Sequence, residues 1–388
     1  MKKILLTAAA ALCLWGAPLD DAVKKLALQL EGEVAHRGAQ TDKNGVTLKG
    51  FSVADEAAVI RAQSIRFEGA DVSKKADLLT ARRIVMEAGS FNDRNGSVID
   101  FKKLTLEAAD LGSFFQVLGS EWGSWQNVVE LSKLKLLDIE QIEAVLEPGA
   151  PKLALKRFVI DGTRFKGGVL EASRYQLTGL DIPVTLIAYM EGEEAKTGDS
   201  LSQTLSDLGY SNLLIDWRDD SSAEGEGMAR KLVARQKLAV AKMGELAFEL
   251  RLSNVPQNTA ALFMQEEMTP QESAALMSIK LDSASLTYTD RGLLPKLYAR
   301  SAAEQKLAPA LYAKTQADEF RQSLAQVQRP ILSAKEIDAL AAFIEKPGTL
   351  TLSVRPREGA MLMELTMLYA ADWRLLMERL ALKVEAVR

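Results

Sequence analysis

The feature that most constrains this chain is a pattern of fourteen residues that occurs five times between residues 59 and 182. All five copies carry apolar residues at positions 7, 9 and 14, and Gly or Ala at position 11. Positions 7 and 9 alternate with mostly polar positions 6, 8 and 10, and a period of two residues is typical of a strand with one buried face. The repeat therefore predicts one β-strand per copy. The copies are Val59–Val72, Leu78–Phe91, Val98–Leu111, Lys152–Phe165 and Val169–Ile182.

The apolar pattern changes parity inside each copy. Position 4 is small or apolar in all five copies, yet it has the opposite parity to positions 7 and 9. In a regular strand it would point to the other face. A β-bulge or bend near positions 5 and 6 returns it to the apolar face, so we expect the same irregularity in every strand.

Spacing and charge indicate how these strands pair. Only five or six residues separate the first three copies, whereas a parallel crossover needs a dozen or more. In an antiparallel pair centred on position 8, position 6 of one strand faces position 10 of its neighbour. Basic residues then meet acidic ones on a solvated face. The position 6 residues are Arg83, Lys103, Arg157 and Arg174, and the position 10 residues are Glu68, Glu87, Glu107 and Asp161.

The apolar face of this sheet has two interpretations. It is an ordinary core covered by helices, or it is a groove that holds acyl chains, because the alternation is the same in both cases. In the second interpretation the apolar side chains are lipid contacts without a chemical role. These candidates are Val59, Ile65, Phe67, Ile84, Met86, Leu104, Leu106, Phe158, Ile160, Tyr175 and Leu177.

The rest of the chain mixes strands and helices. Apolar residues at helical spacing predict helices over 111–137 and 199–208, and the polar stretch 189–200 is a candidate boundary near residue 190. Strands are expected at 212–218, 231–252, 279–290, 349–354 and 361–368, with 219–227 as a polar loop. Thr269 with Glu272 and Ser333 with Glu336 form capping-box patterns that open helices. Helices dominate from 292 to 346, a further helix spans 370–379, and the tail returns as a strand.

These elements predict an α+β fold built on a long, twisted antiparallel sheet, a meander that would form a curved groove in the acyl-chain interpretation. Helices are inserted into it, and the C-terminal part is rich in helix. The expected organisation is an export signal at 1–17, a β-repeat half at 18–190 and an α+β half at 191–388.

The first residues predict export. Lys2 and Lys3 precede a largely apolar run from Ile4 to Ala17, which is shorter than the roughly 20 residues of a membrane span. An uncleaved short anchor is the alternative. The single cysteine, Cys13, lies in this segment, so the mature chain would form no disulfide. A formal net charge of −4 argues against a nucleic-acid partner.

Little in the sequence indicates catalysis or a cofactor. His36 is the only histidine, and without a second histidine or a mature cysteine it cannot build a zinc site of the usual kind. Phosphate-binding glycine motifs and the Gly-x-Ser-x-Gly elbow are absent from the sequence. Asp290, close to Tyr288 and Lys296, is most simply a cap for the helix that follows. We therefore expect a protein that is not an enzyme, with no cofactor or metal.

The five copies resemble the recurrent strands of AsmA-like and YdgA-like proteins of the Gram-negative envelope, and the segment "LTYTDRGLL" (286–294) is similar to one in YdgA-like chains. The resemblance implies a twisted sheet curved into a groove, a periplasmic location and a role in lipid handling or envelope maintenance. Lipid or a membrane surface is then the expected partner. The alternative is a periplasmic scaffold with a covered core that binds an envelope protein.

Overall fold

The computed structural model describes residues 33–42, 44–54, 58–69, 82–108, 133–166, 169–192, 200–257, 269–326 and 332–387. The chain divides into two compact units. The N-terminal unit comprises residues up to Ser206 together with Tyr210–Leu214, and the C-terminal unit comprises Asp207–Gly209 and Ile215–Arg388. The predicted export signal at 1–17 lies outside the described residues.

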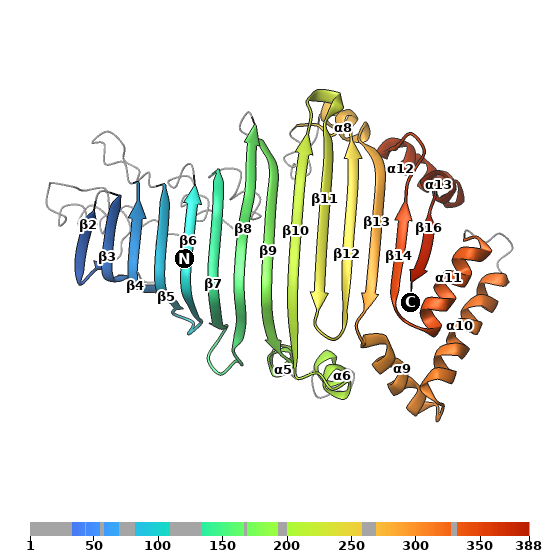
Figure 1. Cartoon of the computed structure of the whole chain (residues 1–388), viewed down its shortest axis with the longest axis horizontal. Coiled ribbons are helices and arrows are strands. Elements are labelled where there is room, and N and C mark those ends of the chain that lie inside the picture. Colours follow the sequence, from blue (N-terminus) through green and yellow to red (C-terminus); the bar gives the residue numbers. More distant parts are fainter. Residues whose placement is uncertain are drawn as a thin grey trace. The chain divides into compact units, whose positions relative to one another are not determined.

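The N-terminal unit is an antiparallel meander in which consecutive strands from β3 to β9 are neighbours (Figure 1). Its edge is formed by β1 and β2, which both pair with β3. The strands are β1 (Glu33–Ala35), β2 (Gly38–Asp42), β3 (Gly45–Ala54), β4 (Ala58–Glu68), β5 (Arg83–Asp93), β6 (Val98–Ala108), β7 (Leu134–Val145), β8 (Leu153–Lys166) and β9 (Val169–Pro183). Helices α5 (Val184–Glu191) and α6 (Leu201–Asp207) follow β9.

The predicted register of the repeat is confirmed. Position 8 of each copy faces position 8 of its neighbour, as Arg66 faces Val85 and Val159 faces Gln176. The five copies correspond to β4, β5, β6, β8 and β9. The end of the first copy, the start of the second and the end of the third lie outside the described residues. The first three copies run antiparallel to one another in turn, which agrees with their short connections, and so do the last two. The third and fourth copies, β6 and β8, flank β7 and run in the same direction.

An irregularity crosses the whole unit. It lies at position 5, as predicted, in the copies on β4, β6 and β8, and at position 11 in those on β5 and β9. In each strand pair from β3–β4 to β8–β9, the register steps over one residue on each strand, and these two residues lie opposite each other. On β3, β5, β7 and β9 the residue stepped over has a positive φ, between 46° and 65°. Both strands change parity there, so residues on either side of the kink share one face. The kink residues are Gly50, Gln63, Ala88, Lys102, Gln141, Lys156 and Gly179.

One strand of this sheet was wrongly expected to be helical. Residues 134–137 begin β7, which pairs with β6 and β8. The rest of the predicted helix, 111–132, lies outside the described residues. β7 follows the repeat pattern in register, with Asp138 at the level of position 8 and Gln141 in place of the Gly or Ala at position 11. This segment pairs with the edges of β6 and β8 because its apolar side chains alternate with polar ones and so continue the same apolar face.

The C-terminal unit is a second antiparallel meander, β10–β11–β12–β13–β14–β16, with helices after β12, β13 and β15 (Figure 1). The strands are β10 (Asn212–Glu224, in this unit from Ile215), β11 (Lys231–Val240), β12 (Gly244–Ser253), β13 (Lys280–Asp290), β14 (Thr349–Val354), β15 (Ala360–Met361) and β16 (Lys383–Val387). The helices are η2 (Gly227–Ala229), α8 (Pro270–Met277), α9 (Leu293–Glu304), α10 (Pro309–Ala325), α11 (Ala334–Glu345), α12 (Leu362–Ala371) and α13 (Trp373–Leu380).

The α+β expectation is confirmed, and both capping boxes form as predicted. Thr269 and Ser333 each accept a hydrogen bond from the backbone N–H of the glutamate three residues later, and that carboxylate accepts in return from the N-cap N–H. Helix α11 packs against β14 and β16, and its Phe343 meets Tyr288 of β13 edge-to-face at 6.0 Å. The helix therefore covers one part of this sheet's apolar face.

Three local predictions in this unit were wrong. Residues 231–252, expected as one strand, form the hairpin of β11 and β12 with a turn at 241–243. Residues 219–224 continue β10 instead of forming a loop, because β11 supplies opposite charges: Asp220 faces Arg235 and Glu224 faces Lys231. Residues 362–368 are helical instead of extended. β15 pairs only with Lys280 and Leu281, the first two residues of β13. From Ala284 onward, β14 occupies the same edge of β13.

Candidate functional site: the sheet faces

The predicted lipid-contact residues of the N-terminal unit form two rows across the sheet. One row contains Ile65, Met86, Leu104, Ile139, Phe158 and Leu177, in which each residue faces the next. The other contains Phe67, Ile84, Leu106, Leu137, Ile160 and Tyr175. Ten of the eleven predicted residues are thus aligned. Val59 of β4 lies beyond the kink on the opposite face, because there it is Ile60 and Ala62 that are buried. The alignment follows from the register centred on position 8.

Burial differs along these rows. Phe67 and Ile160 are fully buried, and Ile65, Ile84, Met86 and Leu106 are exposed by no more than 4%. The other predicted residues, which are Val59, Leu104, Phe158, Tyr175 and Leu177, are half-buried. The β4–β5 side of the face has therefore lost nearly all contact with solvent, while the β8–β9 side, apart from Ile160, keeps part of it.

The opposite face of this unit carries the predicted ion pairs. Arg83 of β5 lies 3.7 Å from Glu68 of β4 and 3.4 Å from Glu107 of β6, and Arg174 of β9 lies 3.6 Å from Asp161 of β8. These pairs join position 6 to position 10 across neighbouring strands. They are partly solvated, so each stabilises the sheet by a few tenths of a kcal/mol and mainly fixes its register.

The sheet of the C-terminal unit has an apolar face that is more open. Leu238, Leu246 and Leu286 lie in the interior of three consecutive strands and are exposed by 39%, 40% and 37%. Leu238 faces Leu246 across β11–β12, and Leu286 faces Phe248 across β12–β13. Large apolar side chains in mid-strand are normally covered, so these three leucines are the candidate contact surface of this unit.

One polar pair lies within this apolar face. Asp219 of β10 is two residues from Trp217 on the same side of the strand and faces Gln236 of β11, whose Nε2 donates to its carboxylate at 3.1 Å. Burial raises the pKa of Asp219 above its ordinary value. The half-buried carboxyl gives this face one hydrogen-bonding group beside the leucines.

A second exposed apolar surface lies on α12 and α13. Apolar residues lie all round α12, and neither helix has a buried residue. Tyr369 is exposed by 73% and Met367 by 56%, and Met363, Trp373 and Leu375 are also exposed. The charge of Glu364 is compensated by Arg379, which holds the pKa of that carboxyl below its usual range. A helix that is apolar all round is normally buried.

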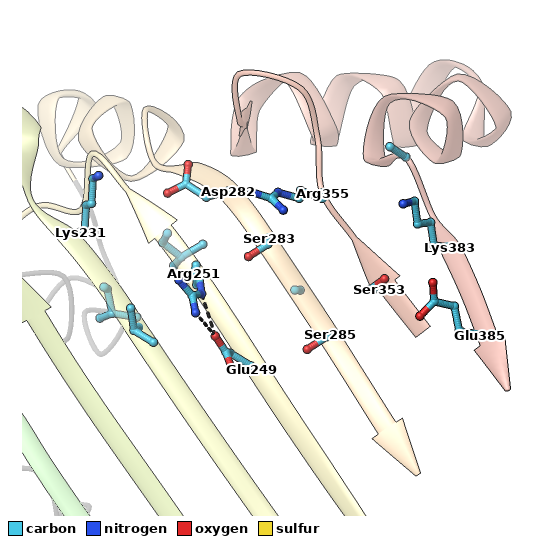
Figure 2. A pocket seen from close by; sticks show the side chains of 15 residues that line it. Lys231, Glu249, Arg251, Asp282, Ser283, Ser285, Ser353, Arg355, Lys383 and Glu385 are labelled. Carbon is cyan, nitrogen blue, oxygen red and sulfur yellow. Dashed lines mark hydrogen bonds and ion pairs between the residues drawn. The ribbon is translucent and has the colours of Figure 1, made fainter. Parts of the chain in front are cut away.

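A cavity of about 700 Å³ opens on the polar face of the same sheet (Figure 2). Cations, carboxylates and hydroxyls line it, from β11 to β16. The polar residues are Lys231, Glu249, Arg251, Asp282, Ser283, Ser285, Ser353, Arg355, Lys383 and Glu385. The cavity and the exposed leucines lie on opposite faces, because successive side chains of a strand alternate.

The residues considered for catalysis near the start of α9 make hydrogen bonds that hold the backbone. Asp290 accepts hydrogen bonds from the backbone N–H groups of Gly292 and Leu294, as expected for a cap, and the Tyr288 hydroxyl donates to it at 3.1 Å. Lys296 Nζ donates to the Leu208 carbonyl at 2.8 Å. No step of a reaction follows from these contacts.

His36 lies in a second cavity of about 590 Å³ in the N-terminal unit. The described residues that line it include Arg37, Lys49 and Arg61 and no carboxylate. A histidine among cations has no acidic partner to orient it as a base. Within the described residues, no group of three or more His, Cys, Asp or Glu side chains could hold a metal ion.

Comparisons with known proteins give a limited result. A family model described as an uncharacterized protein matches residues 237–387, which lie within the C-terminal unit. No curated protein and no solved structure matches the chain. In the described part of the chain, none of the helices combines the length and the apolar character needed to cross a membrane.

Sequence reasoning missed Leu238, Leu246 and Leu286 as candidate contacts. Their alternation with Lys237, Glu245 and Thr287 was visible and had indicated strands. What the sequence does not contain is the placement of α11, which covers β14 and β16 and leaves these leucines exposed.

Proposed function

We propose that this chain is an exported periplasmic protein, not an enzyme, that binds the acyl chain of a lipid on the open apolar face of its C-terminal sheet. The observation that carries the proposal is the exposure of Leu238, Leu246 and Leu286 in mid-strand. Covering such side chains with hydrocarbon is favourable by about 25 cal/mol for each Å² removed from water.

The dimensions of the face support an acyl chain as the occupant. Trp217, Leu238, Leu246 and Tyr288 form one row across four strands. At a strand spacing of about 4.8 Å, the row is roughly 14 Å long. An acyl chain in a bilayer spans half of the roughly 30 Å hydrocarbon core, which is a similar length. Phe343 of α11 covers Tyr288 at one end of the row, so the apolar contact offered to an acyl chain comes from Trp217, Leu238 and Leu246.

The N-terminal face is the second part of this proposal. Its half-buried residues on β8 and β9 (Phe158, Tyr175 and Leu177) offer less free apolar surface than the leucines of the C-terminal unit. We therefore place the primary contact in the C-terminal unit and treat the N-terminal rows mainly as core.

Binding of palmitate to the purified protein tests this proposal. We expect Leu246→Asp to weaken binding by about tenfold or more, since it places a charge in the contact surface. Ala247→Asp is the matched control, because the neighbouring side chain on β12 points to the polar face opposite Lys237. Absence of palmitate binding by the unaltered chain, or an equal loss in both variants, would contradict the proposal.

A second candidate function is that of a scaffold that binds an envelope protein. The exposed apolar surface of α12, with Met363, Met367 and Tyr369, favours it, because methionine-rich surfaces adapt to partner proteins. A photoreactive residue at Tyr369 should give one discrete protein adduct in cells, and one at the exposed Lys314 of α10 should give none. The same pattern of adducts at both positions would argue against this role.

A further inference from the structure

The polar cavity of the C-terminal unit is not used by either proposed function, and its lining indicates a ligand of its own. We propose that it binds an elongated ligand that carries phosphate groups on a sugar-like, hydroxyl-rich frame. The inference rests on the distribution of cations, carboxylates and hydroxyls over five strands of the sheet (Figure 2).

The carboxylates on the β12–β13 side of the cavity already have partners. Glu249 is held by Arg251 at 2.7 Å and by Arg235 at 3.3 Å, and these arginines hold its pKa below the usual value. Asp282 accepts a hydrogen bond of 2.8 Å from the Ser253 hydroxyl. The charge of Glu249 is therefore compensated by arginine, whereas the Ser253 hydroxyl leaves the charge of Asp282 in place. With Glu385 of β16, three carboxylates and four cations line the cavity.

Three cationic side chains that line the cavity form no ion pair with another described residue. Among the described residues, Lys231, Arg355 and Lys383 have no ion-pair partner within 4.0 Å, although each lines the cavity. They belong to different strands: Lys231 opens β11, Arg355 follows the last residue of β14, and Lys383 opens β16. These cations favour a ligand with negative charge.

The separation of these cations indicates more than one anionic group. Four strand spacings separate β11 from β16, because the order is β11–β12–β13–β14–β16. At about 4.8 Å each, Lys231 and Lys383 lie on strands about 19 Å apart. A single carboxylate cannot reach cations at both ends of such a site, whereas a ligand with several phosphates can meet more than one of them.

The middle strands of the cavity, β13 and β14, contribute three hydroxyl groups beside Asp282 and Arg355. Ser283 and Ser285 of β13 and Ser353 of β14 line it, and Ser285 faces Ser353 across the strand pair. Figure 2 shows these serines between Arg251 on one side and Lys383 with Glu385 on the other. A hydroxyl both donates and accepts, so this strip suits the hydroxyl groups of a sugar.

Binding of glucose, glucose 6-phosphate and glucose 1,6-bisphosphate to the full chain tests the inference by isothermal calorimetry. We expect affinity to rise in that order, with the bisphosphate about tenfold tighter than the monophosphate, because each added phosphate meets a further cation. Inorganic phosphate, run in parallel, shows whether the sugar frame contributes, and we expect it to bind more weakly than glucose 6-phosphate. Equal affinity for these two probes would contradict the sugar-like frame.

Two substitutions make the test specific. Lys383→Met should weaken binding of the bisphosphate by about tenfold, since it removes a charge-assisted contact while keeping a long unbranched side chain. Lys237→Met is the control, because Lys237 points to the same face but pairs with Glu245 at 2.8 Å and does not line the cavity. Circular dichroism verifies that both variants fold. Absence of bisphosphate binding at millimolar concentration, or an equal loss in both variants, would overturn the inference.

Discussion

At the residue scale, the repeat is explained by one unusual backbone position. Position 11 is Gly or Ala in the five copies, and on β5 and β9 it is the kink residue with positive φ, at Ala88 and Gly179. Glycine tolerates this conformation because it lacks a Cβ. The sequence predicted a change of parity near positions 5 and 6 of each copy. It did not predict that position 5 of one strand lies opposite position 11 of the next. β7 was not recognised as a copy of the repeat because Gln141 occupies the position at which the other copies have Gly or Ala.

Gln141 provides the most direct test of this explanation. It adopts φ 51° and is exposed, so we expect Gln141→Gly to raise the free energy of unfolding by about 1 kcal/mol through release of the left-handed strain. Gln63 is the matched control, since it is an exposed glutamine at the same kink without a positive φ. Gln63→Gly should lower stability by about 0.5–1 kcal/mol. Urea unfolding measures both, and a loss of stability in Gln141→Gly would contradict the explanation.

Asp219 gives a residue-scale prediction that depends on pH. Burial raises its pKa in the folded state, so the folded chain binds this proton more tightly than the unfolded chain does. The protonated form therefore stabilises the fold at low pH, and this stabilisation is lost as pH rises through the raised pKa. Asp219→Asn should accordingly be more stable than the unaltered chain at pH 7, with the difference vanishing below the ordinary pKa of 3.8. A difference of the same size at pH 3 and pH 7 would rule out this cause.

At the scale of elements, helix starts with a local cause and the pairing of the repeated strands were predicted well, whereas segments whose conformation is decided by competition for a strand edge were not. The helices that follow Thr269 and Ser333 begin where their capping boxes predicted, because the cap is made within four residues of sequence. By contrast, residues 362–368 alternate like a strand and fold as α12. Their conformation is decided by β14, which occupies the edge of β13 that they would need.

The cap of α11 can be tested by one substitution. Ser333→Ala removes the side-chain oxygen that accepts from the Glu336 N–H, and we expect the free energy of unfolding to fall by about 1 kcal/mol. Ser323→Ala is the control, since that hydroxyl donates only to the Phe320 carbonyl on an exposed turn of α10. Thermal unfolding that shows the same small change in both variants would mean that the cap contributes little.

At the scale of the whole molecule, each unit contains an antiparallel sheet with one polar and one apolar face. The sequence predicted this division in the N-terminal unit because the repeat displays it five times. It did not predict which apolar surface stays open, since burial depends on where helices distant in sequence pack. Helix α11 covers the face at β14 and β16 and leaves it exposed at Leu238, Leu246 and Leu286. The proposed lipid site is thus a result of the tertiary arrangement.

The central claim is that this open face holds an acyl chain in the cell. A photoreactive amino acid introduced at Leu286 and, separately, at the adjacent Ser285 tests it directly, because the two side chains point to opposite faces of β13. Irradiation of cells followed by mass spectrometry of the purified chain should give a lipid adduct at position 286 and none at 285. The absence of a lipid adduct at 286, or equal amounts at both positions, would contradict the claim.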